Sequence, residues 1–332
     1  MPWKGEKDPY KVWLSEVILQ QTRVEQGWAY YEKFITHYPA IKQLAAAKDE
    51  EVFKLWEGLG YYSRCRNLLF TARFIVNNLQ GKFPDTYKDI LQLKGVGPYT
   101  AAAIASFCFG LSHAVVDGNV IRVLARVYGI KKPASSGEGK KYFEKMAMEN
   151  LSLKEPGVYN QAIMDFGATV CKPQSPLCSD CVMQKICAAY NEGKVDEYPV
   201  KEKALVKKQR WFSYFIFHAK GKTFIQRRTA KDIWHSLHEY VLHESSAPVN
   251  WNEKKVLQYL KKEMGITKPL HVSIHKAKPQ QLTHQLIEGY FITVELAAAP
   301  SAFSSLDGEW LSHTQLAKKA FPKFINGNMK QG

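Results

Sequence analysis

The stretch Leu93-Lys94-Gly95-Val96-Gly97-Pro98-Tyr99-Thr100 lies between two helical segments and decides how the first half of the chain folds. Glycines at both turn positions, Gly95 and Gly97, allow one backbone to approach another closely. The N–H groups of such a turn, at the start of the helix from Thr100, form a site for a phosphate oxygen. A short Gly-x-Gly also occurs in ordinary helix–helix turns, so the stretch predicts a sequence-independent DNA anchor only together with its neighbours.

On both sides of this turn, from Asp8 to about Tyr190, apolar residues recur at the three- and four-residue spacing of a helix. Few stretches there alternate like strands, so residues 1–190 are expected to form an all-α domain. Residues 191–210 are polar and lysine-rich, including Lys201-Glu202-Lys203, which is typical of a linker.

Residues 211–330 have a different pattern, which predicts strands around a single clear helix at Trp251–Met264. The expected strands are Trp211–His218, Thr223–Arg227 and Tyr290–Leu296. The chain is therefore predicted to be a multidomain protein, with an all-α domain followed by a smaller α+β domain.

The formal net charge of +15 makes a polyanion the leading class of partner, because phosphates attract a basic surface. No apolar run approaches the roughly 20 residues that cross a bilayer, and the first residues lack the features of a signal peptide. We expect no membrane partner and a cytoplasmic location.

Four of the six cysteines form the pattern Cys171-x6-Cys178-x2-Cys181-x5-Cys187. Such clustering indicates a metal site rather than disulfides. Four thiolates with no nearby histidine can hold either zinc or an iron–sulfur cluster, and the spacing alone does not choose between them. Cys65 and Cys108 stand in apolar surroundings and are expected to be small buried hydrophobes.

Two carboxylates stand out because of their surroundings. Asp117 follows a short apolar run and precedes a new helix. One interpretation of this position is that Asp117 is simply the N-cap of that helix and has no role in chemistry. Glu16 is flanked by apolar residues on a helix; it either faces water or, if partly buried, has a raised pKa and donates a proton near neutral pH. One carboxyl group that holds a proton and one that is charged are what cleavage of a glycosidic bond needs.

Taken together, the Leu-x-Gly-Val-Gly hairpin, the Val-Asp-x-Asn-Val segment around Asp117 and the four-cysteine loop resemble the endonuclease III superfamily in order and spacing. The segments Ser15–Thr22, Gly58–Arg64 and Asp117–Val120 are similar to those of adenine glycosylases of the MutY type. The resemblance implies one four-iron four-sulfur cluster on Cys171, Cys178, Cys181 and Cys187. It also implies base excision repair of double-stranded DNA that carries adenine opposite 8-oxoguanine or guanine, by a monomer associated with the nucleoid.

The resemblance assigns roles to individual residues. Glu16 would protonate adenine at N7, Asp117 would stabilise the sugar cation, and Tyr99 and Asn119 would support the site. Bifunctional members have a lysine where this chain has Tyr99; without that amine a monofunctional glycosylase with little lyase activity is expected. Gln21 and Tyr61 match residues that fill or wedge the DNA helix once the adenosine has left the stack, although both could be ordinary surface or core residues. Thr22, Gly95 and Gly97 are expected to bind DNA as well.

The C-terminal part resembles the Nudix-like domain of this family, which reads 8-oxoguanine. Leu282-Thr283-His284 aligns with its Phe-Ser-His loop, so Thr283 and His284 are expected to bind the substrate; a buried structural role is the alternative for His284. The glutamate-rich Nudix box is missing, so pyrophosphate hydrolysis is not expected. The chain also begins at Met1-Pro2-Trp3, where the family has a further helix.

Two other functions fit parts of the sequence. The first is a thymine or oxidised-pyrimidine glycosylase, but Tyr99 and the second domain argue against this interpretation. A non-catalytic iron–sulfur protein that scans DNA would not need both Glu16 and Asp117.

Overall fold

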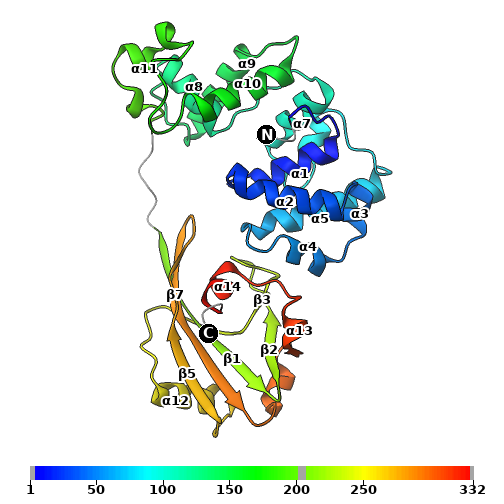
Figure 1. Cartoon of the computed structure of the whole chain (residues 1–332), viewed down its shortest axis with the longest axis vertical. Helices are drawn as coiled ribbons and strands as arrows, with labels where there is room; N and C mark the ends of the chain where they lie inside the picture. Colours follow the sequence, from blue (N-terminus) through cyan, green and yellow to red (C-terminus); the bar gives the residue numbers. More distant parts are fainter. Residues whose placement is uncertain (1–3, 201–206, 330–332) are drawn as a thin grey trace. The chain divides into compact units, whose positions relative to one another are not determined.

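The structure is a computed structural model that describes residues 4–200 and 207–329 (Figure 1). The expectations about Met1-Pro2-Trp3 and about the lysines of 201–206 lie outside the described residues. Contacts divide the chain into two compact units. The first consists of Met1–Ala46 and Arg66–Ala204, and the second of Ala47–Cys65 and Leu205–Gly332. The boundary between Ala204 and Leu205 falls within the expected linker, whereas residues 47–65 are grouped with the C-terminal unit rather than with the helical part around them. No helix of the described residues is long and apolar enough to span a membrane.

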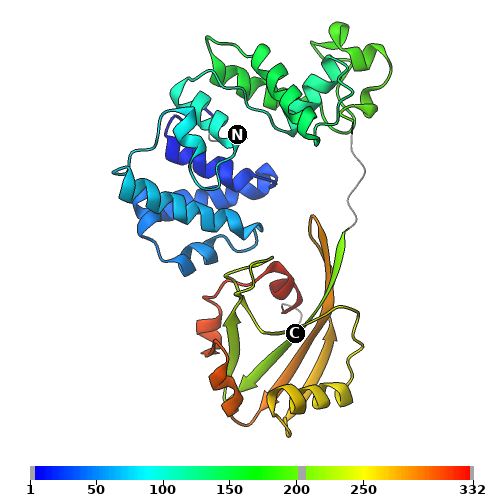
Figure 2. The same cartoon turned by 180° about the vertical axis from the view of Figure 1, so that it is seen from behind.

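The described residues of 4–200 form helices and no strand, which confirms the all-α expectation (Figure 2). The helices are α1 (Pro9–Leu19), α2 (Val24–His37), α3 (Ile41–Ala46), α4 (Asp49–Leu55), α5 (Tyr62–Asn78), α6 (Tyr87–Leu91), α7 (Pro98–Phe109), α8 (Gly118–Val127), α9 (Gly137–Glu149), α10 (Pro156–Thr169) and α11 (Ala188–Asn191), with short 3-10 turns at Gln184–Ile186 and Val195–Glu197.

Helices α1 and α7 of the first unit pack against each other. Asp8 caps α1 by accepting a hydrogen bond from the Tyr10 N–H at 2.9 Å, and Pro9 occupies the first helical position, where the lack of an N–H costs nothing. Eight of its eleven residues are buried, so α1 is a core helix rather than an amphipathic surface helix. Helix α7 carries four buried alanines, Ala101, Ala102, Ala103 and Ala105, which let its neighbours approach closely.

The turn before α7 requires glycine at one of its two positions. Gly95 has φ +82°, and a Cβ there would lie 2.6 Å from the Asn67 Cβ. At Gly97 the backbone is extended and no atom would contact an added Cβ. The close approach expected at both glycines is therefore found only at Gly95, where the turn packs against α5.

Helix α10 packs against α7 and α8. A Cβ at Gly167 of α10 would lie 2.7 Å from the Asn119 Cβ and 2.9 Å from the Asn119 carbonyl oxygen. Only a glycine permits this approach without displacing the first turn of α8.

The second unit contains a mixed β-sheet with strand order β3-β2-β1-β7-β5, to which β4, β6 and β8 add at β1, β7 and β2. Its strands are β1 (Lys208–Ala219), β2 (Lys222–Arg227), β3 (His238–Glu239), β4 (Val241–Ser245), β5 (His271–Lys276), β6 (Gln280–Gln281), β7 (Gln285–Leu296) and β8 (Gly308–Ser312). The β1–β7 pair is parallel, with Lys208 opposite Gln285, and the other pairs are antiparallel.

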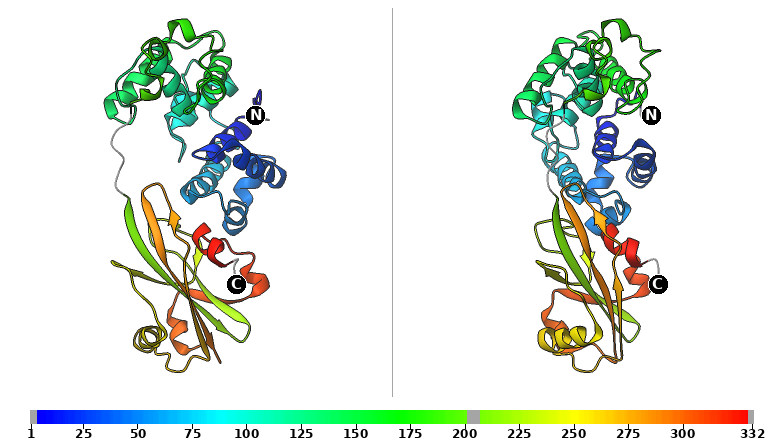
Figure 3. Two further views of the ribbon diagram at one scale, coloured as in Figure 1. Left: turned by 60° about the vertical axis from the view of Figure 1, so that its left-hand side comes forward. Right: turned by 90° about the vertical axis from the view of Figure 1, so that its left-hand side faces the viewer.

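Helices cover both faces of this sheet (Figure 3). Successive residues of β1 point to opposite faces. Phe212 and Tyr214 pack with Phe324 of α14 (Lys323–Met329), whereas Phe215 and Phe217 pack with Leu260 of α12 (Glu253–Met264). A further short helix, α13 (His313–Leu316), follows β8, and a 3-10 turn spans Ser301–Ser305. The expected strands and the expected helix are thus present, with β1 and β7 longer than predicted.

Candidate active site

Glu16 lies on α1 and is buried, with 7% of its surface exposed, which rules out the water-facing alternative. Burial raises the pKa of its carboxyl group to about 7, because a charged carboxylate is poorly solvated in the core. A hydrogen bond with the Tyr99 side chain lowers this pKa, and the nearby charge of Asp117 raises it. Glu16 is therefore a carboxyl group that holds its proton near neutral pH and can release it.

Tyr99 stands at the second position of α7 and links the two carboxylates. Burial raises the pKa of its phenol well above the usual value, and the charges of Glu16 and Asp117 act in the same direction. The Tyr99 hydroxyl also lies 3.8 Å from the Met164 Sδ of α10. The phenol therefore stays protonated and acts as a hydrogen-bonding neighbour of Glu16.

Asp117 is the N-cap of α8, as one interpretation of the sequence expected. Its Oδ1 accepts hydrogen bonds from the Asn119 and Val120 N–H groups at 2.9 and 2.8 Å, and its Oδ2 accepts one from the Asn119 Nδ2 at 2.7 Å. The Asn119 Oδ1 in turn accepts a hydrogen bond from Arg122 at 2.8 Å. These contacts fix the orientation of both side chains, and Arg122 is a member of the group that the sequence did not single out.

The four residues expected to be catalytic thus come from three segments distant in sequence: Glu16 from α1, Tyr99 from α7, and Asp117 and Asn119 from the start of α8. Electrostatic contacts join Glu16, Tyr99 and Asp117 into one group. A proton-holding carboxyl group beside a carboxylate anchored by backbone N–H groups is an arrangement suited to acid-assisted bond cleavage.

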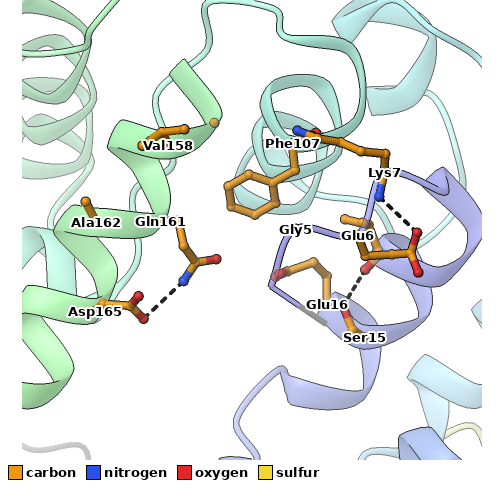
Figure 4. Close-up of a pocket in the computed structure, with 12 residues that line it drawn as sticks. Gly5, Glu6, Lys7, Ser15, Glu16, Phe107, Val158, Gln161, Ala162 and Asp165 are labelled. Carbon is orange, nitrogen blue, oxygen red and sulfur yellow. Dashed lines mark hydrogen bonds between the residues drawn. The ribbon is translucent and has the colours of Figure 1, made fainter. Parts of the chain in front are cut away.

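A cavity of about 330 Å³ opens at Glu16 (Figure 4). Residues Gly5–Lys7 and Phe107 line one side, and α10 lines the other with Val158, Gln161 and Asp165. Lys7 Nζ donates a hydrogen bond to the Phe107 carbonyl oxygen at 2.8 Å, which holds the N-terminal segment at the cavity. The sequence did not reveal Gln161 or Asp165, because a polar pair one turn apart on a helix is common on any surface.

The residues expected to contact DNA are exposed or half-buried. Gln21 follows α1, is exposed and has φ +57°, and the Thr22 N–H donates to the Leu19 carbonyl oxygen at 3.0 Å. Tyr61, in the second unit, is 45% exposed and has φ +48°. Left-handed backbone is uncommon for residues other than glycine, costs of order 1–3 kcal/mol and is concentrated at functional sites. No sequence pattern indicated this conformation at either residue.

Thr283 and His284 form the turn between β6 and β7. The Tyr61 hydroxyl and the Thr283 Oγ1 are hydrogen-bonded within the second unit. The His284 side chain is exposed, so the buried structural alternative for this histidine is wrong.

The four clustered cysteines form no disulfide, and each is half-buried. Buried Arg126 joins two of them: its Nη1 lies 3.4 Å from the Cys171 Sγ, and its carbonyl oxygen lies 3.4 Å from the Cys187 Sγ. Burial raises the pKa of the Cys178 thiol, and the charges of the other three cysteines add to this effect. Within residues 4–200 and 207–329, no group of three or more cysteine, histidine or acidic side chains is gathered closely enough to hold a metal ion.

The pKa of Glu16 leads to a prediction about stability. An unfolded glutamate loses its proton near pH 4.5 and the folded Glu16 near 7, so the folded chain binds more protons between these values. The contribution of the Glu16 proton to the free energy of unfolding is therefore fully present below pH 4.5. It is lost as the pH rises through about 7, and the loss is about 3 kcal/mol at most. Because glutamine stays neutral, Glu16→Gln is expected to gain stability relative to the wild type between pH 5 and pH 8.

Chemical unfolding of both proteins at the two pH values measures this difference. Glu32→Gln, a change at an exposed residue of α2, is the matched control and is expected to show no such trend. A constant difference between wild type and Glu16→Gln across this range would contradict the raised pKa.

Comparisons with known proteins give the family. Residues 14–149 match HhH-GPD, the HhH-GPD superfamily base excision DNA repair protein family. An adenine DNA glycosylase from Buchnera aphidicola subsp. Acyrthosiphon pisum is 37% identical over 239 residues, which cover 71% of this chain and 68% of that protein. The enzyme of the same name from Buchnera aphidicola subsp. Schizaphis graminum is 34% identical over 282 residues, with coverage of 83% and 80%.

Among solved structures, a thermostable thymine-DNA glycosylase is 30% identical, with a TM-score of 0.52 over 58% of this chain and 88% of that one. The alignments with the two Buchnera enzymes are longer than the helical part of this chain. They also cover more than two thirds of the length of each of those enzymes. The chain accordingly belongs to the adenine DNA glycosylase family, within the HhH-GPD superfamily of base excision repair proteins.

Proposed function

We propose that this protein excises adenine paired with 8-oxoguanine or guanine in double-stranded DNA, as a monofunctional glycosylase that acts as a monomer. The observation that carries this proposal is the buried Glu16 carboxyl group, which holds a proton near neutral pH at the edge of a cavity. We further propose that the protein acts in the cytoplasm, in association with nucleoid DNA.

The reaction breaks the bond between the sugar C1′ and the adenine N9. Glu16 donates its proton to N7, so that adenine leaves as a neutral base. Positive charge then develops on the sugar, and the Asp117 carboxylate stabilises it. Water supplies the hydroxyl group that adds to C1′, and its remaining proton restores Glu16. Asn119 keeps Asp117 in place through the hydrogen bond from its side-chain nitrogen.

The cavity at Glu16 is the proposed site for the flipped base. Enzymes that act on a base in a duplex must first rotate it out of the stack into a pocket. A volume of about 330 Å³ is at the small end of the range for ligand pockets, as suits a single base. Gln161 supplies a side-chain amide, the group that pairs best with the hydrogen-bonding edge of adenine.

Tyr99 supports the monofunctional assignment. A lyase step requires an amine that attacks C1′ and forms a Schiff base. Where the bifunctional relatives carry lysine, this chain presents a phenol whose pKa is raised well above its usual value. The proposed product is therefore an abasic site in an intact strand.

Several surfaces are proposed to hold the DNA. The Gly95–Gly97 turn offers N–H groups to a backbone phosphate at the start of α7. Gln21 and Tyr61 are exposed and are proposed to enter the duplex, and Thr22, which follows Gln21 in the sequence, is proposed to bind DNA as well. The second unit, a mixed sheet with helices on both faces, is proposed to be a Nudix-like domain whose exposed Thr283 and His284 read 8-oxoguanine.

The four clustered cysteines are proposed to hold a four-iron four-sulfur cluster because of their spacing and the family resemblance, although the described residues bring no three of them close enough for a metal ion. Their thiols influence one another electrostatically, and the buried Arg126 guanidinium supplies positive charge beside Cys171, which suits a set of anionic thiolates. The cluster would hold the loop of Cys171–Cys187 together, and Arg126 connects this loop to α8, so the cluster would stabilise the fold.

Single-turnover excision tests the proposed activity. A duplex with adenine opposite 8-oxoguanine is expected to lose its base, with strand breaks only after alkali, whereas A·T and thymine-containing duplexes remain uncleaved. Glu16→Gln is expected to lower the rate by about 100-fold or more with duplex affinity retained, because general acid catalysis contributes about 10² to 10⁴.

Glu32→Gln serves again as the matched control and should be as active as the wild type. Full activity of Glu16→Gln would remove the proposed acid. Strand breaks without alkali would point to a lyase, and excision of thymine alone to the pyrimidine branch. Tight binding without excision would favour the scanning protein.

Analysis of iron and sulfide in the purified protein tests the cluster. The wild type is expected to contain both, and Cys181→Ser is expected to lose them together with much of its folding stability. Cys108→Ser, a cysteine outside the loop, should keep the wild-type content. Zinc in place of iron, or iron that survives Cys181→Ser, would contradict the assignment.

A further inference from the structure

Gln161 and Asp165 lie one turn apart on α10, at the wall of the cavity (Figure 4). The Gln161 Nε2 donates a hydrogen bond to the Asp165 Oδ1 at 3.1 Å. The other carboxylate oxygen of Asp165 is paired with the Lys4 ammonium group of the N-terminal segment. Asp165 therefore joins a helix on one side of the cavity to the segment on the other.

This contact fixes which end of the Gln161 amide faces the cavity. An ionised carboxylate can only accept hydrogen bonds, so the amide group must present its nitrogen to Asp165. The amide oxygen then points away from Asp165. Figure 4 shows this arrangement, with the Gln161 oxygen directed toward the side of Gly5 and Glu16. The cavity therefore meets a hydrogen-bond acceptor at Gln161 and a proton donor at Glu16.

We propose that Asp165 is a positioning residue that holds Gln161 as an acceptor and thereby makes the cavity select 6-amino over 6-oxo purines. This inference rests on the proposed excision of adenine from the same cavity. Adenine carries an acceptor at N7 and a donor at the 6-amino group along one edge, which complements Glu16 and Gln161. Guanine and hypoxanthine carry an acceptor oxygen at position 6, which would face the Gln161 oxygen with no proton between them.

Asp165→Asn removes this constraint, because an asparagine amide offers both a donor and an acceptor. Gln161 can then turn its nitrogen toward the cavity and donate to a 6-oxo group. A hydrogen bond gained or lost in a buried site changes a rate by roughly tenfold. We expect the ratio of adenine to hypoxanthine excision to fall by about that factor. Lys4 acts only through Asp165 and is partly exposed, so Lys4→Met should change the ratio less.

The test compares single-turnover rates on two duplexes, one with adenine and one with hypoxanthine opposite 8-oxoguanine. Each protein is assayed on both duplexes from one preparation, so the fraction of folded enzyme cancels in the ratio. Asp165→Glu keeps an acceptor-only carboxylate and should stay near the wild-type ratio. Asp85→Asn makes the same chemical change at an exposed residue before α6 and should not alter the ratio.

An Asp165→Asn ratio equal to that of the wild type would overturn the inference, even if both rates fall, because a merely structural role lowers them together. The proposed function would stand in that case, since the wild type would still excise adenine. Absence of adenine excision by the wild type would instead overturn the proposed function. A lowered ratio in Asp165→Asn, restored in Asp165→Glu, is the result that supports the positioning role.

Discussion

The packing of the helices around Glu16 depends on one requirement, which is that its carboxyl group stays buried. A carboxyl group without water keeps its proton near neutral pH only if the surrounding helices stay packed. Helix α1 meets this requirement because eight of its eleven residues are buried, and α7 allows close packing through its buried alanines. Tyr99, from the same helix, satisfies the carboxyl group with a hydrogen bond. The packed core therefore stabilises the fold and also sets the chemistry of the site. The loss of solvation that raises the pKa of Glu16 is what allows this residue to donate a proton.

The second carboxylate depends on helix geometry rather than on burial. Asp117 is both the N-cap of α8 and the candidate partner of Glu16, so the structural and functional interpretations of this residue are compatible. Its position follows from the contact between Gly167 and Asn119, where a larger residue would displace the first turn of α8. Helix α10 therefore contributes to the site in two ways. Gly167 near its C-terminal end holds the first turn of α8, and its cavity-lining face carries Gln161 and Asp165.

Much of this arrangement could be predicted from the sequence, because long periodic segments and closely spaced motifs are local signals. The helical part, the strands β1, β2 and β7 and helix α12 are of this kind. The group of Glu16, Tyr99, Asp117 and Asn119 is instead predicted from the resemblance to a known family, because its members lie on segments distant in the sequence. Gln161, Asp165 and Lys4 could not be predicted, because their meeting depends on how the N-terminal segment lies against α10. The same holds for Arg122 and Arg126, which contact Gly167 and Cys171, each 45 residues away in the sequence, and for the left-handed backbone of Gln21 and Tyr61. The grouping of residues 47–65 with the C-terminal unit likewise arises from tertiary contacts alone.

The central claim is that a proton held by buried Glu16 starts the removal of the base, and the pH dependence of single-turnover adenine excision tests it most directly. The account predicts a rate that is constant at lower pH and falls, by up to tenfold per pH unit, as the pH rises through about 7, where the folded Glu16 loses its proton. A rate that stays constant through this range, or that increases with pH, would show that the proton comes from elsewhere.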